Sequence, residues 1–367
     1  MRDQGPRLSV RFAAVFVAFL CALLIVEGLS RLVFAYQDEL YGNAFLSNLV
    51  RGEMVLDPYE IASPTIGEHW KLRAGYPFSD TSESQYRINQ DGMRGPEIDK
   101  SHSRIRILTL GDSVTFGLNS VTYPRILEGA LDEAGVSVEV INGGVEGYFP
   151  RNLLYEIDRY VSFHPDVVTI FIGWNALYSP ILWLGKYEQT FRTLWFIRNL
   201  KRSIYRQFKG ERAYATEMLA RTPLPVVHSS EVMYADKYSP NFLGKIEKII
   251  DRFQAKGSRV FLLTLPGLFA SDESLSLKAL KIGHMPAFTV NPYVLAKITQ
   301  RYNQSLRNLA ARRGLGLIDL ASWSERNLSP REDFFLDSVH LTPEGLIRIG
   351  SYIAEQIKPA LGKEQKP

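Results

Sequence analysis

From residue 105 onward the chain alternates between two patterns of apolar positions. Short continuous runs of β-branched and aliphatic residues are followed by longer segments with apolar residues at helical spacing. Such alternation is typical of a parallel sheet covered by helices on both faces. The predicted strands are 105–111, 136–142, 166–173, 259–267 and 315–320, and the predicted helices are 123–135, 150–164, 239–257, 292–314 and 342–361. The pattern therefore predicts an α/β protein, a three-layer α/β/α sandwich with a five-stranded parallel sheet.

The alternation pauses between residues 176 and 238, which we interpret as an insertion in a domain spanning 105–362. Between Lys186 and Arg221 nine Lys or Arg residues stand against three Glu, interleaved with aromatic residues. One interpretation is a cationic, aromatic lid that touches anionic lipid or acidic polysaccharide near the mouth of a site. The other is a solvated helical pair whose aromatic side chains pack on the main domain.

Residues 36–104 show no sustained periodicity and are rich in Tyr, Pro, Gly and Ser. The pattern favours a loop-rich stalk or apron ahead of the domain, with a turn at Gln90-Asp91-Gly92.

The first 35 residues contain the longest apolar stretch. Three arginines, Arg2, Arg7 and Arg11, precede fifteen uncharged apolar residues from Phe12 to Val26. Fifteen residues suit a secretory signal that is later cleaved. Continued to Phe34, the segment is about 34 Å long as a helix, which is enough to span a bilayer.

We favour the uncleaved anchor, with Glu27 and Arg31 paired at i,i+4 spacing. The preceding arginines place the amino terminus in the cytoplasm. The sequence therefore predicts a single-pass membrane protein with its large domain across the membrane from the cytoplasm, or a secreted protein if the signal is cleaved.

Composition narrows the function classes. With 46% hydrophobic residues the chain can build a large core. Its net charge of +4 is small and no basic arm is present, which argues against nucleic-acid binding. The single cysteine, Cys21, excludes an intramolecular disulfide and any cluster of thiolate ligands.

The first predicted strand ends in "LTLGDSVTFG", with Ser113 where a helix would begin. Reactive groups gather at the carboxyl ends of parallel strands, and backbone N–H groups at a helix start stabilise developing negative charge. Ser113 is therefore a candidate nucleophile for acyl transfer. Taken alone, Gly-Asp-Ser is also ordinary turn sequence.

A serine nucleophile needs a base, and the base needs an orienting partner. Of six histidines, His340 has the right neighbours, because Asp337 precedes it by three residues in "FFLDSVHLTPEG". Thr342 and Pro343 follow as the cap and first residue of the last helix. His164, ahead of Pro165, is interpreted as a residue that ends a helix.

These segments together resemble the SGNH (GDSL) hydrolases, in particular membrane-anchored bacterial members, whose fold is flavodoxin-like. The resemblance is carried by "GDSVTFG", "VINGGVEGY", "FIGWNAL" and "DSVHLTPEG". It implies that Ser113 is the nucleophile and that Asp337 and His340 complete the triad. It also implies an oxyanion hole formed by Ser113, Gly147 and Asn175. Similar members carry a segment like "YRINQDGMRGPE", so 86–97 is expected to belong to the domain structurally.

The resemblance implies an exported serine esterase that needs no metal or organic cofactor. Its expected substrate is an acyl ester, with acetyl favoured, on a carbohydrate or lipid. The alternatives are an O-acyltransferase acting on a cell-envelope polysaccharide and a non-catalytic carbohydrate-binding or scaffold module. The departure at Ala176, where the family usually has aspartate, removes no expected catalytic group. A dinucleotide-binding protein is disfavoured because "NGGVEG" lacks the G-x-G-x-x-G spacing.

Overall fold

The computed structural model of the chain divides into two compact units, which are described separately. The larger consists of residues 56–61, 70–182 and 211–367, and the smaller of 1–55, 62–69 and 183–210. The described residues are 8–36, 56–66, 69–77, 87–117, 121–179, 190–194, 196–197, 229–270, 275–286 and 288–362. Most of the predicted lid, including 198–228, lies outside the described residues.

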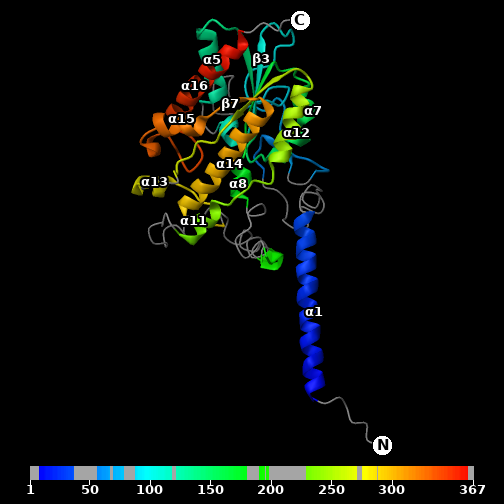
Figure 1. Ribbon diagram of the computed structural model, residues 1–367. Coiled ribbons are helices and arrows are strands. Elements are labelled where there is room, and N and C mark those ends of the chain that lie inside the picture. Colours follow the sequence, from blue (N-terminus) through cyan, green and yellow to red (C-terminus); the bar gives the residue numbers. More distant parts are fainter. Residues whose placement is uncertain are drawn as a thin grey trace, which may run out of the picture. The chain divides into compact units, whose positions relative to one another are not determined.

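The larger unit is built on a five-stranded parallel sheet, as predicted (Figure 1). Its order is β4-β3-β5-β6-β7. The strands are β3 (Ile105–Gly111), β4 (Val138–Gly144), β5 (Val167–Phe171), β6 (Arg259–Leu263) and β7 (Gly316–Ile318). The chain places β4 on one side of β3 and the later strands β5, β6 and β7 on the other. At such a change of direction a crevice for a ligand is expected beyond the carboxyl ends of the strands.

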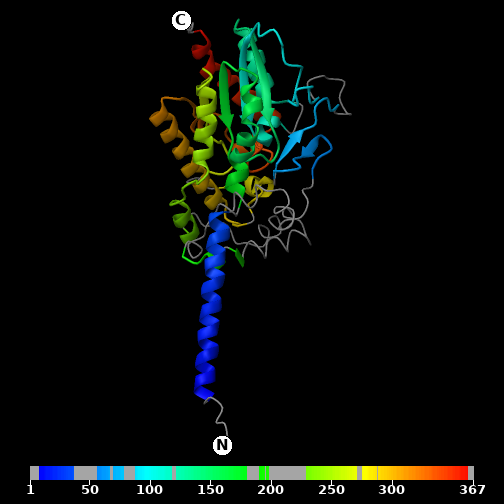
Figure 2. The same cartoon turned by 90° about the vertical axis from the view of Figure 1, so that its right-hand side faces the viewer.

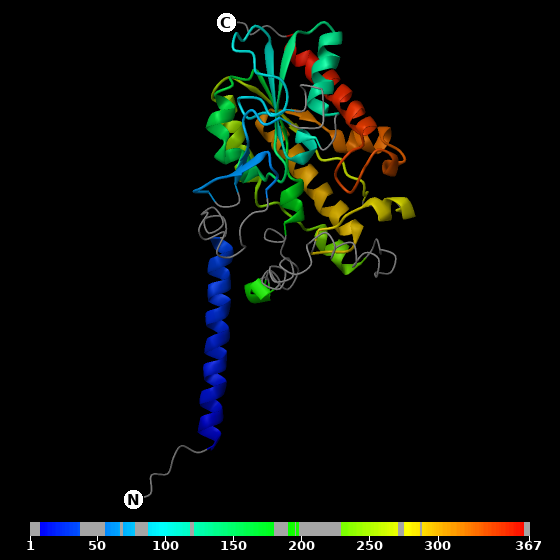
Figure 3. The same cartoon turned by 180° about the vertical axis from the view of Figure 1, so that it is seen from behind.

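Helices cover both faces of this sheet. On one face α5 (Tyr123–Glu133) and α16 (Pro343–Leu361) pack against each other (Figure 1). They approach closely at Gly350, where a Cβ would lie 2.7 Å from the Ile126 side chain. Figure 3 shows α7 (Ile157–Val161) and α12 (Leu243–Gln254) on the opposite face from α5 and α16. The helices of that face that contact one another are α6 (Pro150–Tyr155), α7 (Ile157–Val161) and α12 (Leu243–Gln254).

The remaining helices lie around these layers. The long helix α14 (Pro292–Arg313) contacts β6 and β7. The shorter ones are α4 (Ser113–Phe116), α8 (Trp174–Tyr178), α11 (Ser230–Ala235), α13 (Leu277–Ile282), α15 (Leu320–Asn327) and the 3₁₀ turn η2 (Arg331–Asp333).

Register aligns the carboxyl ends of the first three strands. Gly111, the last residue of β3, lies between Gly144 of β4 and Phe171 of β5. A Cβ at Gly111 would lie 2.6 Å from the Phe171 carbonyl oxygen, so this close approach requires glycine. The loops after the three strands therefore start at one edge of the sheet.

One predicted helix is interrupted. The segment 150–164 forms α6 and α7, which are separated at Glu156, where φ is −93° and ψ is 6°. The Glu156 side chain is buried and pairs with Lys71 at 2.9 Å and Arg159 at 3.3 Å. A buried carboxylate must keep such partners, and periodicity alone does not reveal them.

The predicted apron contains ordered structure ahead of β3. Strands β1 (Glu60–Ala62) and β2 (Trp70–Leu72) form a two-stranded sheet, drawn in blue in Figure 2. Residues 88–94 form a tight hairpin closed by the Ile88–Arg94 bridge. Its turn at Gly92 has φ +69°, and the Gly92 N–H donates to Asn89 O at 2.9 Å, which confirms the predicted turn. The hairpin continues the main sheet, because Arg94 forms an antiparallel bridge with Asn142 of β4.

In the smaller unit, helix α1 (Leu8–Ala35) contains the predicted apolar segment. Residues Phe12–Val33 have a mean hydropathy of 2.6 and are long and apolar enough to cross a bilayer, a criterion that a secretory signal also meets. Glu27 and Arg31 pair at 2.8 Å, as their spacing predicts. The Glu27 carboxylate also accepts hydrogen bonds from the backbone N–H groups of Arg192 and Thr193, at 3.0 and 2.9 Å.

Candidate active site

Ser113 is the first residue of α4, directly after the turn that ends β3. Asp112 caps this helix, because its side chain accepts a hydrogen bond from the Val114 N–H at 3.2 Å. Such a cap contributes about 1 kcal/mol. Burial raises the Asp112 pKa to about 6, although the Val114 N–H and the charge of His340 act in the opposite direction. The cap fixes the start of α4 and with it the Ser113 backbone.

Asp337 and His340 lie on one short loop ahead of α16. A bridge between Phe335 and Leu341 closes the loop, and Thr342 caps α16 by accepting from the Gly345 N–H at 3.2 Å. The predicted cap is therefore confirmed.

Both oxygens of the Asp337 carboxylate make hydrogen bonds. Oδ1 accepts the backbone N–H groups of Val339 and His340, each at 2.8 Å, and Oδ2 lies 2.8 Å from His340 Nδ1. Burial by itself would raise the Asp337 pKa, but the hydrogen bond and charge of His340 outweigh it and lower the pKa to about 2. Asp337 is therefore ionised at neutral pH and can orient the imidazole.

The Ser113 hydroxyl completes a continuous hydrogen-bonded chain. Its Oγ lies 2.8 Å from His340 Nε2, across 227 residues of sequence. A proton on His340 Nδ1 would be donated to Asp337, which leaves Nε2 free to accept the serine proton. The structure thus brings together the three residues that the sequence selected, in the order serine, histidine, aspartate.

Gly147 lies in the turn after β4 with φ +72°. A Cβ there would lie 2.8 Å from the indole ring of Trp70, so both the backbone and its neighbour require glycine. Asn175 lies in the first turn of α8, and its Nδ2 donates to the carbonyl oxygen of Tyr148 at 3.1 Å. Asn175 thus contacts the residue that follows Gly147, and its amide has a second hydrogen to donate.

His284 is a second histidine beside Asp337, and it is not among the site residues predicted from the sequence. The Nδ1 of His284 lies 3.6 Å from Asp337 Oδ2, and the ring of Tyr178 packs on His284 with centroids 5.0 Å apart. Ser338 links the loop of Asp337 to the segment of His284, because its Oγ accepts a hydrogen bond from the His284 N–H at 3.0 Å. His284 stands in "IGHMPAF", where no neighbouring residue indicates such a contact.

His164 follows α7 with φ +51°, and its N–H donates to Val161 O at 3.0 Å, which fits the interpretation as a helix-ending residue. Its ring packs against His102 at 6.0 Å. Among the residues that the structure describes, no group of three His, Cys, Asp or Glu side chains is placed to hold a metal ion.

Comparison with known proteins gives a family. The model described as the GDSL-like lipase/acylhydrolase family matches residues 109–346. The chain is also similar to three solved esterase or acylhydrolase structures. An acetyl xylan esterase, AlAXEase, has 18% identity over 70% of this chain and 99% of its own, with a TM-score of 0.40. The lipase/acylhydrolase from Enterococcus faecalis has 17% identity over 71% of this chain and 99% of its own, with a TM-score of 0.40.

A variant of the acetyl-xylooligosaccharide esterase Axe2 from Geobacillus Stearmophilus has 14% identity over 71% of this chain and 96% of its own, with a TM-score of 0.42. No curated protein matches the chain. The family model covers well over half of the residues, including Ser113 and His340. The chain therefore belongs to the GDSL-like lipase/acylhydrolase family and is an SGNH-type ester hydrolase.

Proposed function

We propose that the protein is a serine esterase in which Ser113, His340 and Asp337 act as nucleophile, base and orienting carboxylate. The observation that carries the proposal is the chain of two 2.8 Å contacts that links the three side chains. His340 takes the Ser113 proton as Oγ attacks the ester carbonyl carbon, and then gives that proton to the departing alcohol. Water, activated by the same histidine, releases the acyl group and regenerates the serine.

In this proposal the oxyanion is stabilised by three donors: the backbone N–H groups of Ser113 and Gly147 and the side-chain amide of Asn175. Two features support the assignment. Ser113 is the first residue of the helix that follows β3, a position where a backbone N–H can meet developing negative charge, and Gly147 has a positive φ that departs from strand geometry. Asn175 lies against the Gly147 turn through Tyr148.

The proposed substrate is a short acyl ester, acetyl above all, on a carbohydrate or lipid. The test is a panel of acetylated sugars, acetylated xylan and p-nitrophenyl esters of increasing chain length, each with and without a sugar acceptor. We expect short-chain ester hydrolysis by the wild type. Asn175→Ala should lower kcat by about 10²–10³ through loss of one oxyanion donor. The exposed Asn308→Ala on α14 serves as the matched control and should retain wild-type rates.

The outcomes separate the candidate functions. If an added sugar hydroxyl takes the acyl group faster than water does, the protein is an acyltransferase with the same residues. If the folded wild type turns over no ester with or without an acceptor, the esterase proposal is wrong and a non-catalytic binding module takes its place.

We also propose that α1 anchors the protein in a bacterial inner membrane, with the amino terminus in the cytoplasm and the larger unit in the periplasm. The length and apolar character of Phe12–Val33 support this. The full-length chain should stay with membranes after alkaline washing, and a chain lacking residues 1–35 should be released. A shortened, soluble mature form would instead identify the segment as a cleaved signal.

A further inference from the structure

We infer that Arg94 is a positioning residue for the nucleophile: it fixes the far end of the one-turn helix that carries Ser113. The inference rests on the proposed role of Ser113. Arg94 ends the hairpin 88–94, which lies ahead of the region matched by the family model, since that region begins at residue 109.

Helix α4 needs support at its carboxyl end. It has four residues and is spanned by two i→i−4 hydrogen bonds, from the Phe116 N–H to Asp112 O at 2.9 Å and from the Gly117 N–H to Ser113 O at 2.8 Å. One isolated turn is not stable by itself, and the last carbonyl groups of a helix have no partner within it. Here the partner is Arg94, whose Nη1 donates to the carbonyl oxygens of Phe116, at 2.8 Å, and Gly117.

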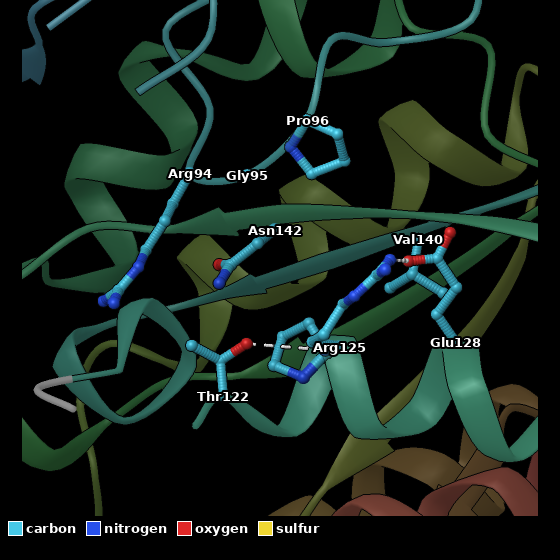
Figure 4. Close-up of a pocket in the computed structure, with 9 residues that line it drawn as sticks. Arg94, Gly95, Pro96, Thr122, Arg125, Glu128, Val140 and Asn142 are labelled. Atoms are coloured by element: carbon cyan, nitrogen blue, oxygen red, sulfur yellow. Dashed lines mark hydrogen bonds and ion pairs between the residues drawn. The ribbon is translucent and has the colours of Figure 1, made fainter. Parts of the chain in front are cut away.

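The Arg94 side chain is fixed by its surroundings. It is 8% exposed, and its guanidinium lies 4.6 Å from the centroid of the Phe116 ring. Asn142 reinforces the same contact, since its Nδ2 donates to Phe116 O at 3.3 Å. Arg94 and Asn142 both line the pocket drawn in Figure 4, where their side chains extend in the same direction. Tyr59 stacks on the Phe116 ring with centroids 5.7 Å apart and an angle of 13° between the ring planes.

The backbone that carries Arg94 is equally well held. Asn89 Oδ1 accepts from the N–H groups of Asp91 and Met93 at 3.0 and 2.8 Å, and its Nδ2 donates to Pro96 O at 2.8 Å. The bridge between Arg94 and Asn142 joins this hairpin to β4. Arg94 is thus a short link between a rigid hairpin and the catalytic turn.

Both ends of α4 are therefore fixed by charged side chains, Asp112 at the start and Arg94 at the end. A cation at the carboxyl end of a helix also interacts favourably with the helix dipole. Release of one end would let the turn tilt, which would move Ser113 Oγ away from His340 and misdirect the Ser113 N–H. Displacements of about 1 Å in such sites cost about 10²-fold in rate.

The test compares Arg94→Met with Arg87→Met. Arg87 directly precedes the hairpin but pairs with Glu97 at the surface, with its side chain 42% exposed. For Arg94→Met we expect kcat per active site to fall by about 10²-fold with KM changed less than about threefold. The rate constant for fluorophosphonate labelling of Ser113 should fall in parallel. Arg87→Met should stay within about twofold of the wild type in both measurements.

Two further variants keep a loss of stability from being mistaken for a positioning role. Arg94→Lys retains the charge without the forked donors and should recover part of the rate. Added methylguanidinium should partly restore Arg94→Ala, which a purely structural loss would not allow. Titration with the probe counts the folded active sites, so kcat is expressed per site.

Wild-type kcat per site and wild-type labelling rates in Arg94→Met would overturn the inference, as would a loss explained entirely by fewer folded sites. A wild type that neither labels at Ser113 nor hydrolyses any ester would instead remove the proposed function, and the positioning role with it.

Discussion

Ser113→Ala is expected to lower kcat for ester hydrolysis by about 10⁶-fold, because no acyl-enzyme can form without the hydroxyl. The folded protein should also lose all labelling by fluorophosphonate probes, since these react with an activated serine. The measurement is steady-state hydrolysis of the best ester of the panel, together with mass analysis of the labelled peptide.

Ser137→Ala is the matched control, because Ser137 is exposed in the turn before β4 and should behave as wild type. Hydrolysis by Ser113→Ala at more than about a hundredth of the wild-type rate would contradict the assignment of the nucleophile. Labelling of the wild type at another serine would contradict it more directly.

Asp337→Asn is expected to lower kcat by about 10⁴-fold while leaving ester binding nearly unchanged. An amide at this position can donate a hydrogen bond to His340 Nδ1, which favours the tautomer that carries its proton on Nε2. That tautomer cannot accept the Ser113 proton. The measurement is kcat and KM at pH 8, with the surface variant Asp251→Asn as the control, since the Asp251 side chain is 57% exposed and pairs with Arg313 at 2.6 Å.

The pH dependence gives an independent check of the same assignment. Because the Asp337 pKa is held near 2, this carboxylate stays ionised throughout the working range. A fall of wild-type activity on acidification between pH 5 and 8 should therefore not come from protonation of Asp337. Asp112, whose pKa burial raises to about 6, can contribute to such a fall beside the imidazole base. A flat profile from pH 5 to 8 would exclude a histidine base.

The lowered Asp337 pKa also affects the free energy of unfolding. The folded pKa lies below the unfolded value, so the ionised carboxylate stabilises the fold at neutral pH. That contribution is lost as the pH falls from about 4 toward 2. Asp337→Asn should consequently show a weaker loss of stability over this acidic range than the wild type.

The sequence predicted the parts of the structure that local pattern determines. Continuous apolar runs located the five strands, and Thr342 with Pro343 located the start of α16, because capping depends on neighbouring residues. The association of Ser113 with Asp337 and His340 could be predicted because parallel strands all end at one edge, and because similar proteins use the same motifs.

Contacts made between distant segments could not be predicted in this way. Arg94 and Trp70 lie in a stretch without periodicity, and their partners, Phe116 and Gly147, become neighbours only once β3 and β4 are paired. His284 reaches Asp337 through the packing of two loops, which no spacing within either loop encodes. Glu156, where the predicted helix is broken, likewise pairs with Lys71, which is far away in the chain.

The hairpin beside β4 affects where a truncated form of the domain can begin. Strand β4 is one of the two edge strands of the sheet, and Arg94 forms an isolated antiparallel bridge with its residue Asn142. A chain started at residue 105, where the strand-helix repeat begins, would keep the pairing of Val138–Gly144 with β3 but would lose the bridge at Asn142 on the edge of the sheet. A buried strand of seven residues with an open edge is a template for pairing with the same strand of another molecule. We therefore expect a chain that lacks the hairpin to associate through β4 more readily than the full chain.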